Sequence, residues 1–254
     1  PSQGDYNQVT KSAGHGDYHP IVLAPSTIQE AIDLTVLSFD LADKYRTLVI
    51  LVADGAIGQM MEPAELPPMR PLREERPAWA LTGAKGRERN TNSSIHMGAE
   101  ELEAFNLKLQ EKLALIEKNE IRYEALHTEE ADVTIVAFGT AARVAQTAMQ
   151  SLRQEGLSVG LFRPITLWPF PEEQLAQAAK NSKALFVVEM NAGQMLHDVR
   201  AAVGTQIPIK FLGRMGGAVP MPDEVAEKTR TLIEQLRAPE NYLWQERKNG
   251  KSSR

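Results

Sequence analysis

The stretch from Ile21 to Pro63 constrains the fold most, because two strand-like apolar runs flank one helix-like run. The runs are Ile21–Ala24 and Thr47–Ala53, and the second is apolar from Leu48 to Val52, which is typical of a parallel strand covered on both faces. Between them, a stripe recurs at helical spacing: Ile28, Ile32, Thr35, Phe39 and Ala42. This pattern predicts a β-α-β unit.

Polar residues at the ends of these runs predict where the helix starts and where the second strand stops. Ser26 stands where an N-cap belongs, and Gln29 three residues later completes a capping-box pattern. Asp54 and Gly55 follow the second apolar run and predict a turn.

From Ala131 onward the chain alternates regularly between apolar runs and helical patterns. This alternation predicts a parallel sheet with right-handed crossovers. We expect strands over residues 133–138, 157–162, 184–188 and 207–212, and helices over residues 142–155, 172–179 and 193–203.

The middle of the chain has a different character. Five prolines between Pro63 and Trp79 predict an extended crossing, and residues 80–98 read as an exposed loop. Residues 99–124 predict a long charged helix that bridges domains or packs on a partner chain; its stripe is Leu102, Phe105, Leu109, Leu113 and Ile116. We therefore divide the chain into domain 1–78, loop and bridging helix 79–130, domain 131–236 and tail 237–254.

Polar residues follow the predicted strands of the second domain, at the edge where open α/β sheets bind ligands. They are Arg163, Glu189, Asn191 and Arg214, and together they form a rim that could bind an anion. The favoured interpretation is that they are turn residues, with Glu189 pairing with an arginine across the rim or with another chain.

Composition narrows the classes of function. The net charge of −5 and the absence of a concentrated basic face argue against nucleic-acid binding. No apolar run approaches the roughly 20 residues of a membrane span, and we expect a cytoplasmic protein. The chain has no cysteine, so it cannot itself ligate an iron–sulfur cluster, and its five histidines are too dispersed to suggest a metal site.

Several segments resemble a known family. The Gly14 to Gly55 stretch is similar to the thiamine-pyrimidine domain of the alpha subunit of 2-oxoacid:ferredoxin oxidoreductases, and Pro1 to Tyr6 is similar to the stretch after the family's Gly-rich loop. LFRPITLWPFP (161–171), VEMNAGQ (188–194) and GRMGGAVPMP (213–222) resemble its transketolase C-terminal-like domain. The wording is most similar to 2-oxoisovalerate and 2-oxoglutarate subunits.

The resemblance implies a partial thiamine-pyrimidine-type parallel-sheet domain followed by a transketolase C-terminal-like parallel α/β domain. It implies oxidative decarboxylation of a 2-oxoacid to acyl-CoA on thiamine diphosphate and Mg²⁺, with electrons passed to ferredoxin. The cofactor would be shared with a beta, diphosphate-binding subunit, and the iron–sulfur clusters would lie on other subunits, including a ferredoxin-like one. We also expect a homodimer when the chain is isolated.

The site residues of the family are only partly matched. The family's activating glutamate and the first part of its pyrimidine domain have no counterpart here, so no catalytic residue is expected in this chain. Ala53-Asp54-Gly55 lacks the first glycine of the family's magnesium motif, which favours a structural turn. Gln3, Asp5, Asp54 and Gly55 remain weak cofactor-binding candidates, and we expect no metal ligand.

Two alternatives stay open. The chain could be the beta chain of a transketolase-type 2-oxoacid dehydrogenase, which should not share the VEMNAGQ and GRMGG segments. It could also be a non-catalytic α/β binding or interaction module that uses the rim of the second domain.

Overall fold

The computed structural model of the protein describes residues 2–71 and 76–238, so nearly all of the expected tail 237–254 lies outside it. The helices are α1 (Tyr6–Thr10), η1 (Ser12–Gly14), α2 (Ile28–Tyr45), α3 (Gly55–Gln59), α4 (Ala99–Asn119), η2 (Thr128–Glu130), α5 (Gly139–Gln154), α6 (Glu172–Ala179), α7 (Met195–Val203) and α8 (Pro222–Arg237). The strands are β1 (Ile21–Leu23), β2 (Val49–Leu51), β3 (Tyr123–Leu126), β4 (Val133–Val136), β5 (Val159–Pro164), β6 (Thr166–Trp168), β7 (Ala184–Glu189) and β8 (Ile209–Gly213).

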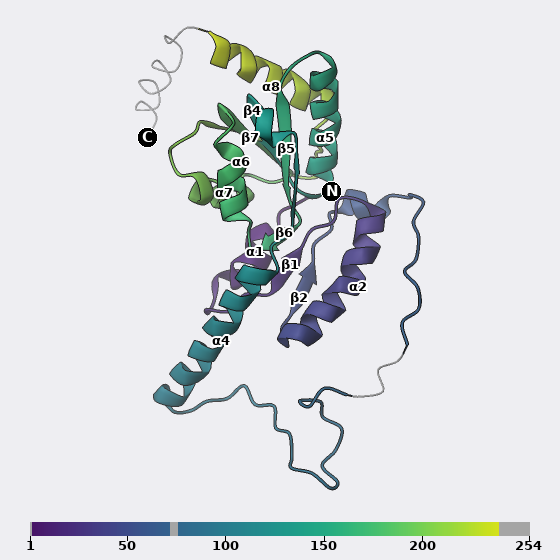
Figure 1. Cartoon of the computed structure of the whole chain (residues 1–254), viewed down its shortest axis with the longest axis vertical. Coiled ribbons are helices and arrows are strands. Elements are labelled where there is room, and N and C mark those ends of the chain that lie inside the picture. Colours follow the sequence, from purple (N-terminus) through teal and green to yellow (C-terminus); the bar gives the residue numbers. More distant parts are fainter. Residues whose placement is uncertain (1, 72–75, 239–254) are drawn as a thin grey trace.

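Within the described residues these strands form two sheets, of order β2-β1-β6 and β3-β5-β4-β7-β8. The predicted α/β class is confirmed, with parallel pairs β1–β2, β4–β5, β4–β7 and β7–β8. Neither sheet is wholly parallel, because β6 runs antiparallel to β1 and β3 runs antiparallel to β5. Figure 1 shows the larger sheet above and the smaller one below, beside α2 and α4.

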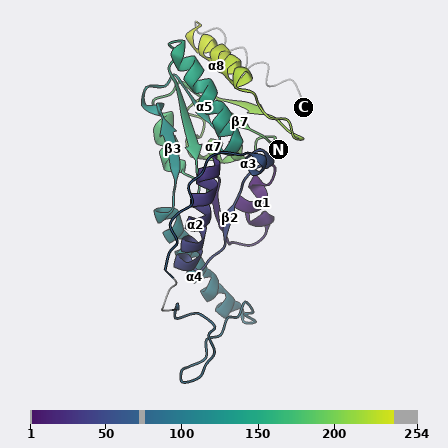
Figure 2. The ribbon, with the colours of Figure 1, turned by 90° about the vertical axis from the view of Figure 1, so that its right-hand side faces the viewer.

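The two sheets share a hydrophobic core. On one face of the larger sheet, α5 and α8 pack side by side and bury residues such as Ile135, Leu152 and Ile233 (Figure 2). On the other face, the core under α6 and α7 runs without a break into the core of β1, α2, α4 and β6. The β6 strand strengthens this connection, because it directly follows β5 of the larger sheet yet pairs with β1 of the smaller one.

The predicted start of α2 is off by one residue. Thr27, not Ser26, is the N-cap, and its side chain accepts a hydrogen bond from the Glu30 backbone N–H. The Glu30 carboxylate in turn accepts from both the backbone N–H and the hydroxyl of Ser26. The reciprocal capping pattern therefore exists, but it uses Thr27 and Glu30 in place of Ser26 and Gln29.

The predicted stripe on α2 is wrong. Leu34 and Leu41 are buried, with Leu37 and Tyr45 packed beside them, while Phe39 is 72% exposed. The strand predicted over residues 47–53 is shorter, because only Val49–Leu51 pair with β1. It is also an edge strand of intermediate burial, so the prediction that both of its faces are covered is wrong.

The bridging segment also differs from expectation. The helix predicted over residues 99–124 ends at Asn119, and residues 123–126 form β3 on the edge of the larger sheet. Leu113 and Ile116 are buried in the shared core, whereas Leu102 and Phe105 are more than 40% exposed. The helix therefore anchors through its C-terminal half and projects its N-terminal half away from the body (Figure 1).

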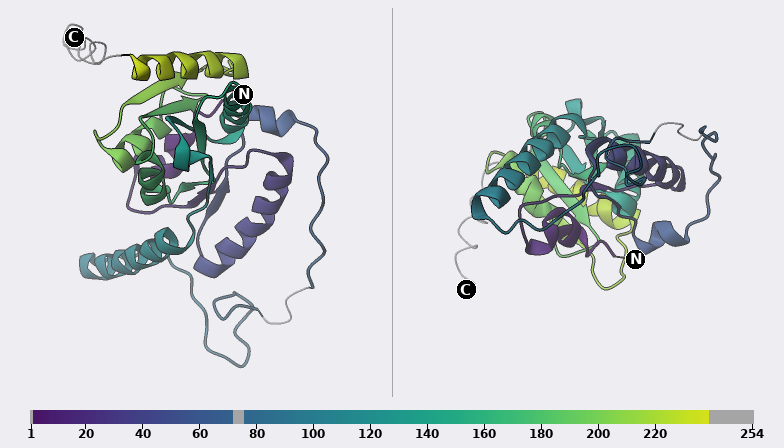
Figure 3. Two further views of the ribbon diagram at one scale, coloured as in Figure 1. Left: turned by 45° about the horizontal axis from the view of Figure 1, so that its top comes forward. Right: turned by 90° about the horizontal axis from the view of Figure 1, so that it is seen from below.

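The long connection between α3 and α4 follows the prediction. Its described residues contain no regular helix or strand, and the path loops far out from both sheets (Figure 3). The part nearest α3 is held to α2 by polar contacts: Glu65 and Gln29 exchange hydrogen bonds, and Arg70 pairs with Asp40. No described helix is both long enough and apolar enough to cross a lipid bilayer.

Candidate functional site

Asp54 lies where the two sheets meet, at the start of two helices. One carboxylate oxygen accepts from the backbone N–H groups of Ala56 (3.0 Å) and Ile57 (3.3 Å), which caps α3. The same oxygen accepts from the Thr140 hydroxyl (2.8 Å), and the other accepts from the Thr140 backbone N–H (3.1 Å) at the start of α5. One buried carboxylate therefore caps a helix of each half of the chain.

This contact explains why α5 begins three residues earlier than predicted. Gly139, expected in a turn, is the first residue of α5 and has a φ of +56°, which favours glycine. A Cβ added there would lie 2.9 Å from Gln3 Nε2 and 3.2 Å from an Asp54 carboxylate oxygen. The glycine thus allows the close approach of Gln3 and Asp54 to the start of α5.

Gln3 is a second buried link between the halves. Its side chain donates to the Phe138 carbonyl (2.8 Å) and accepts from the Met190 N–H (2.9 Å), and its own N–H donates to the Met190 carbonyl (3.1 Å). Asn191 donates to the Gln3 carbonyl (3.0 Å), while its side-chain oxygen accepts from the N–H groups of Gly193 and Gln194. The segment that begins at Gln3 therefore docks on the loop after β7.

Glu189 is fully buried at the end of β7 and faces the start of α7. Its two carboxylate oxygens accept from the backbone N–H groups of Met195 (2.9 Å) and Leu196 (3.0 Å). Burial raises the pKa of Glu189 above its usual value, although these hydrogen bonds oppose the rise. The expected pairing of Glu189 with an arginine is wrong, because backbone donors of α7 occupy the carboxylate.

Arg163 is buried at the end of β5 and links β5 to α2 and β3. Its guanidinium donates two bonds to the Glu30 carboxylate (2.6 and 2.9 Å) and one to Glu124 (2.9 Å). Burial alone would raise the pKa of Glu30, but the bonds from Arg163 and Ser26 outweigh it and lower that pKa below its usual value. Arg163 is thus part of the junction rather than an unpaired cation of a rim.

The remaining candidates lie apart from this junction. Asp5 is exposed at the start of α1 and makes no side-chain cap, and Gly55 is the exposed first residue of α3. Arg214 is exposed and pairs with Glu224 of α8 (2.6 Å). Arg163, Glu189, Asn191 and Arg214 each contact different partners, so an anion site at this rim stays a prediction.

Sequence reasoning missed a buried polar cluster beside the junction. The Tyr6 hydroxyl donates to one oxygen of Asp198 (2.6 Å), and the Lys11 ammonium contacts the other (2.5 Å). Burial, followed by the Asp198 charge, raises the pKa of Tyr6 well above its usual value. Nothing local in the sequence indicated the pair, because Tyr6 and Asp198 lie 192 residues apart.

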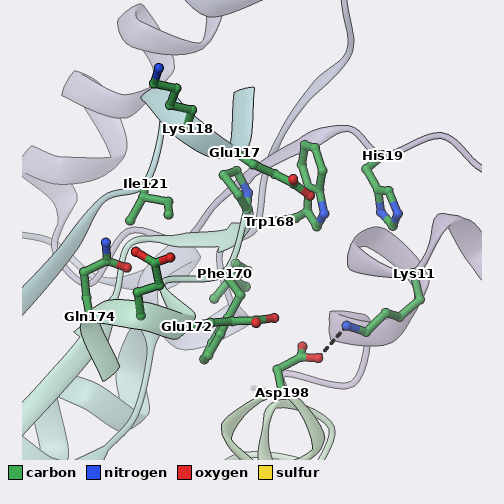
Figure 4. A pocket seen from close by; sticks show the side chains of 13 residues that line it. Lys11, His19, Glu117, Lys118, Ile121, Trp168, Phe170, Glu172, Gln174 and Asp198 are labelled. Carbon is green, nitrogen blue, oxygen red and sulfur yellow. Dashed lines mark hydrogen bonds and ion pairs between the residues drawn. The ribbon is translucent and has the colours of Figure 1, made fainter. Parts of the chain in front are cut away.

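A cleft of about 580 Å³ opens next to this cluster, between the two halves of the chain. Figure 4 shows Lys11 and Asp198 on one side, Trp168 and His19 along the back, and Glu172 and Gln174 of α6 on the other side. The rings of His19 and Trp168 are stacked, with centroids 4.8 Å apart.

We tested whether the described residues could hold thiamine diphosphate and Mg²⁺. Asp54 does not fit the role of a magnesium ligand, because four protein donors already occupy its two oxygens. Gln3 is similarly engaged by backbone groups. No group of three or more His, Asp or Glu side chains among the described residues could hold a metal ion.

Comparisons with known proteins agree with this architecture. A family model described as "Pyruvate flavodoxin/ferredoxin oxidoreductase, thiamine diP-bdg" matches residues 1–119, and one described as "Pyruvate:ferredoxin oxidoreductase core domain II" matches residues 131–225. The ketoisovalerate oxidoreductase subunit VorB of Methanothermobacter thermautotrophicus is 45% identical over 91% of this chain. The 2-oxoglutarate synthase subunit KorA of Methanothermobacter marburgensis is 32% identical over 89% of this chain and 67% of its own length.

The chain belongs to the family of 2-oxoacid:ferredoxin oxidoreductase subunits. The family assignment confirms the resemblance and decides against a transketolase-type dehydrogenase beta chain. The chain spans 65% of the length of the VorB relative. The structure of 2-oxoglutarate:ferredoxin oxidoreductase from Magnetococcus marinus matches the fold with a TM-score of 0.73 and 24% identity, over 91% of this chain and 45% of that one.

Proposed function

We propose that this chain is alpha-subunit sequence of a thiamine-diphosphate-dependent 2-oxoacid:ferredoxin oxidoreductase whose substrate is 2-oxoisovalerate or a similar branched-chain 2-oxoacid. The 45% identity to a ketoisovalerate oxidoreductase subunit, spread over 91% of the chain, carries the proposal. A 2-oxoglutarate-using enzyme is the second candidate, supported by relatives named 2-oxoglutarate synthase subunits at 32% identity.

The chemistry requires groups beyond the described residues. Thiamine diphosphate supplies the carbanion stabilisation that decarboxylation of a 2-oxoacid needs. Because the described residues do not fit a complete thiamine diphosphate and Mg²⁺ site, we assign the diphosphate and metal end to a beta, diphosphate-binding subunit. The chain has no cysteine, so a ferredoxin-like subunit would carry the iron–sulfur clusters that pass electrons to ferredoxin.

The residues of this chain have a structural part in the proposed enzyme. Asp54, Gln3 and Arg163 each join an element of the first half to one of the second. These contacts fix the first half, matched by the thiamine-diphosphate-binding family model, against the second half. A rigid junction keeps the face offered to a partner subunit in one geometry.

The division into domains 1–78 and 131–236, joined by segment 79–130, remains part of the proposal. We further propose that the isolated chain forms a homodimer, because Leu102 and Phe105 leave apolar surface exposed along α4. CoA and ferredoxin would act through the assembled complex in the cytoplasm, and no role with nucleic acid or membrane is proposed.

Reconstitution tests the proposed function directly. The chain, extended to full length where its gene encodes more, is co-expressed with its beta and ferredoxin-like partners. Viologen reduction is then followed with CoA, thiamine diphosphate and either 2-oxoisovalerate or 2-oxoglutarate. A higher kcat/KM for 2-oxoisovalerate is expected. Preference for 2-oxoglutarate would move the assignment to the second candidate, and no reduction with either acid in a correctly assembled complex would refute it.

A further inference from the structure

The cleft beside Trp168 has walls from both halves of the chain. Its residues come from the ends of α1 and α4, from the segment before β1, from the β6–α6 connection and from α7. The cleft is distinct from the junction at Asp54 and Gln3, and the proposed decarboxylation does not use it. We therefore asked which ligand chemistry its side chains favour.

The charges in this cleft are unbalanced. Glu117, Glu172 and Glu173 line it, and none of them has an ion-pair or hydrogen-bond partner among the residues that the structure describes. Asp198 is already paired with Lys11 at 2.5 Å, and the side chain of Lys118 points away from Glu172 and Asp198 (Figure 4). Three carboxylates thus share one cleft without a compensating cation, an arrangement that disfavours their joint ionisation and attracts positive charge.

An unpaired acceptor in the same cleft is a second, independent observation. The side-chain oxygen of Gln174 is shielded from solvent and has no donor partner among the described residues. A buried amide oxygen without a partner costs about 1–3 kcal/mol, which a ligand N–H group would recover. The free polar groups of Glu117, Glu172, Glu173 and Gln174 are therefore all hydrogen-bond acceptors, and the complementary ligand must be a donor.

The apolar wall favours a particular shape of donor. Ile121, Leu167, Trp168 and Phe170 line the cleft beside the carboxylates. Trp168 is held in place by its stacking on His19. A ligand with a short aliphatic stem and a cationic head could lay the stem on this wall and place the head among the carboxylates.

We propose that this cleft binds an alkylammonium or alkylguanidinium group. The group could be a free polyamine-type molecule or a lysine or arginine side chain of a partner protein, because both present the same stem and head. This inference does not depend on which 2-oxoacid the enzyme uses.

Binding to the complete chain tests the proposal. Butylguanidinium, butylammonium and 1-pentanol are each titrated, with the indole N–H resonance of Trp168 and calorimetry as readouts. The peptide Gly-Gly-Arg-Gly-Gly serves as the protein-derived source, and MgCl₂ serves as the probe for simple counterion binding. Glu117→Gln and Glu172→Gln remove carboxylates of the cleft, and Glu129→Gln removes an exposed carboxylate outside it. Thermal melting of each variant verifies that it is folded.

The expected result is saturable binding of the two cations with a shift at Trp168, and no binding of 1-pentanol. Each cleft variant should weaken binding about fivefold, the effect of an exposed ion pair, and Glu129→Gln should leave it unchanged. Tighter binding of the peptide than of butylguanidinium would indicate a partner side chain, and the reverse would indicate a free amine. Equal competition by Mg²⁺, equal binding of 1-pentanol, equal loss in Glu129→Gln, or no binding would each overturn the proposal.

Discussion

Replacing Asp54 should destabilise the protein far more than replacing an ordinary helix cap. Asp54→Ala removes the α3 cap, for which about 1 kcal/mol is typical. It also leaves the buried N–H and hydroxyl of Thr140 without an acceptor, which costs about 1–3 kcal/mol more. We therefore expect the free energy of unfolding to fall by about 3 kcal/mol.

Asp54→Asn separates hydrogen bonding from charge. The amide keeps one acceptor oxygen, but its NH₂ group would face the Thr140 donors, so a loss of about 1–2 kcal/mol is expected. A sequence-based expectation of about 1 kcal/mol counted only the cap on α3. The larger loss reflects the second helix that the same carboxylate caps.

Urea denaturation followed by circular dichroism measures these values, with Asp223→Ala as the matched control. Asp223 lies in the first turn of α8, is exposed and makes no side-chain hydrogen bond among the described residues, so its loss should cost less than about 0.5 kcal/mol. A double-mutant cycle with Thr140→Ala should show a coupling of about 1 kcal/mol. Additive effects, or a loss for Asp54→Ala no larger than for Asp223→Ala, would refute the shared cap.

Three further variants probe the junction and the proposed dimer. Glu30→Gln should cost about 2 kcal/mol at pH 7, less than a fully buried pair, because the Glu30 side chain is 27% exposed. Since the folded pKa of Glu30 is lowered, its contribution is present above the unfolded value of about 4.3 and is lost as pH falls below it; the variant should therefore lose less stability than wild type on acidification, and parallel pH profiles would contradict this. Gly139→Ala should cost about 2 kcal/mol in the same denaturation assay, because the residue keeps a positive φ and its new Cβ would press on Gln3; an unchanged midpoint would exclude this packing. Phe105→Asp should shift sedimentation of the free chain from dimer to monomer at micromolar concentration, and a wild-type monomer would argue against the dimer proposal.

The sequence predicted the larger sheet well, because its strands and helices follow local patterns. The helix over residues 172–179 appears with the predicted bounds, since Pro171 precedes it and its apolar spacing is regular. The smaller sheet was harder to predict. β6 is three residues long and pairs with β1, whose partner register no local pattern reveals.

Burial on α2 and the junction residues depend on long-range contacts. The α2 sequence offers apolar residues on more than one face, and only packing against the rest of the core selects Leu34 and Leu41 over Phe39. Asp54 was predicted to lie in a turn, but its contact with Thr140 spans 86 residues of sequence. Short motifs could not show that a turn residue of one half caps a helix of the other.

The continuous core predicts that the two halves unfold together. Leu167 on β6 is 1% exposed and contributes to the core that joins both sheets, whereas Leu152 on α5 belongs to the core on the opposite face. Leu167→Ala and Leu152→Ala should each cost about 2–5 kcal/mol, because each leaves a cavity in packed surroundings. Calorimetry of each variant should show one transition at a lower Tm, since the shared core and the contacts of Asp54 and Gln3 couple the halves. Two separated transitions, with Leu167→Ala moving only one of them, would show that the halves are independent domains held together by surface contacts.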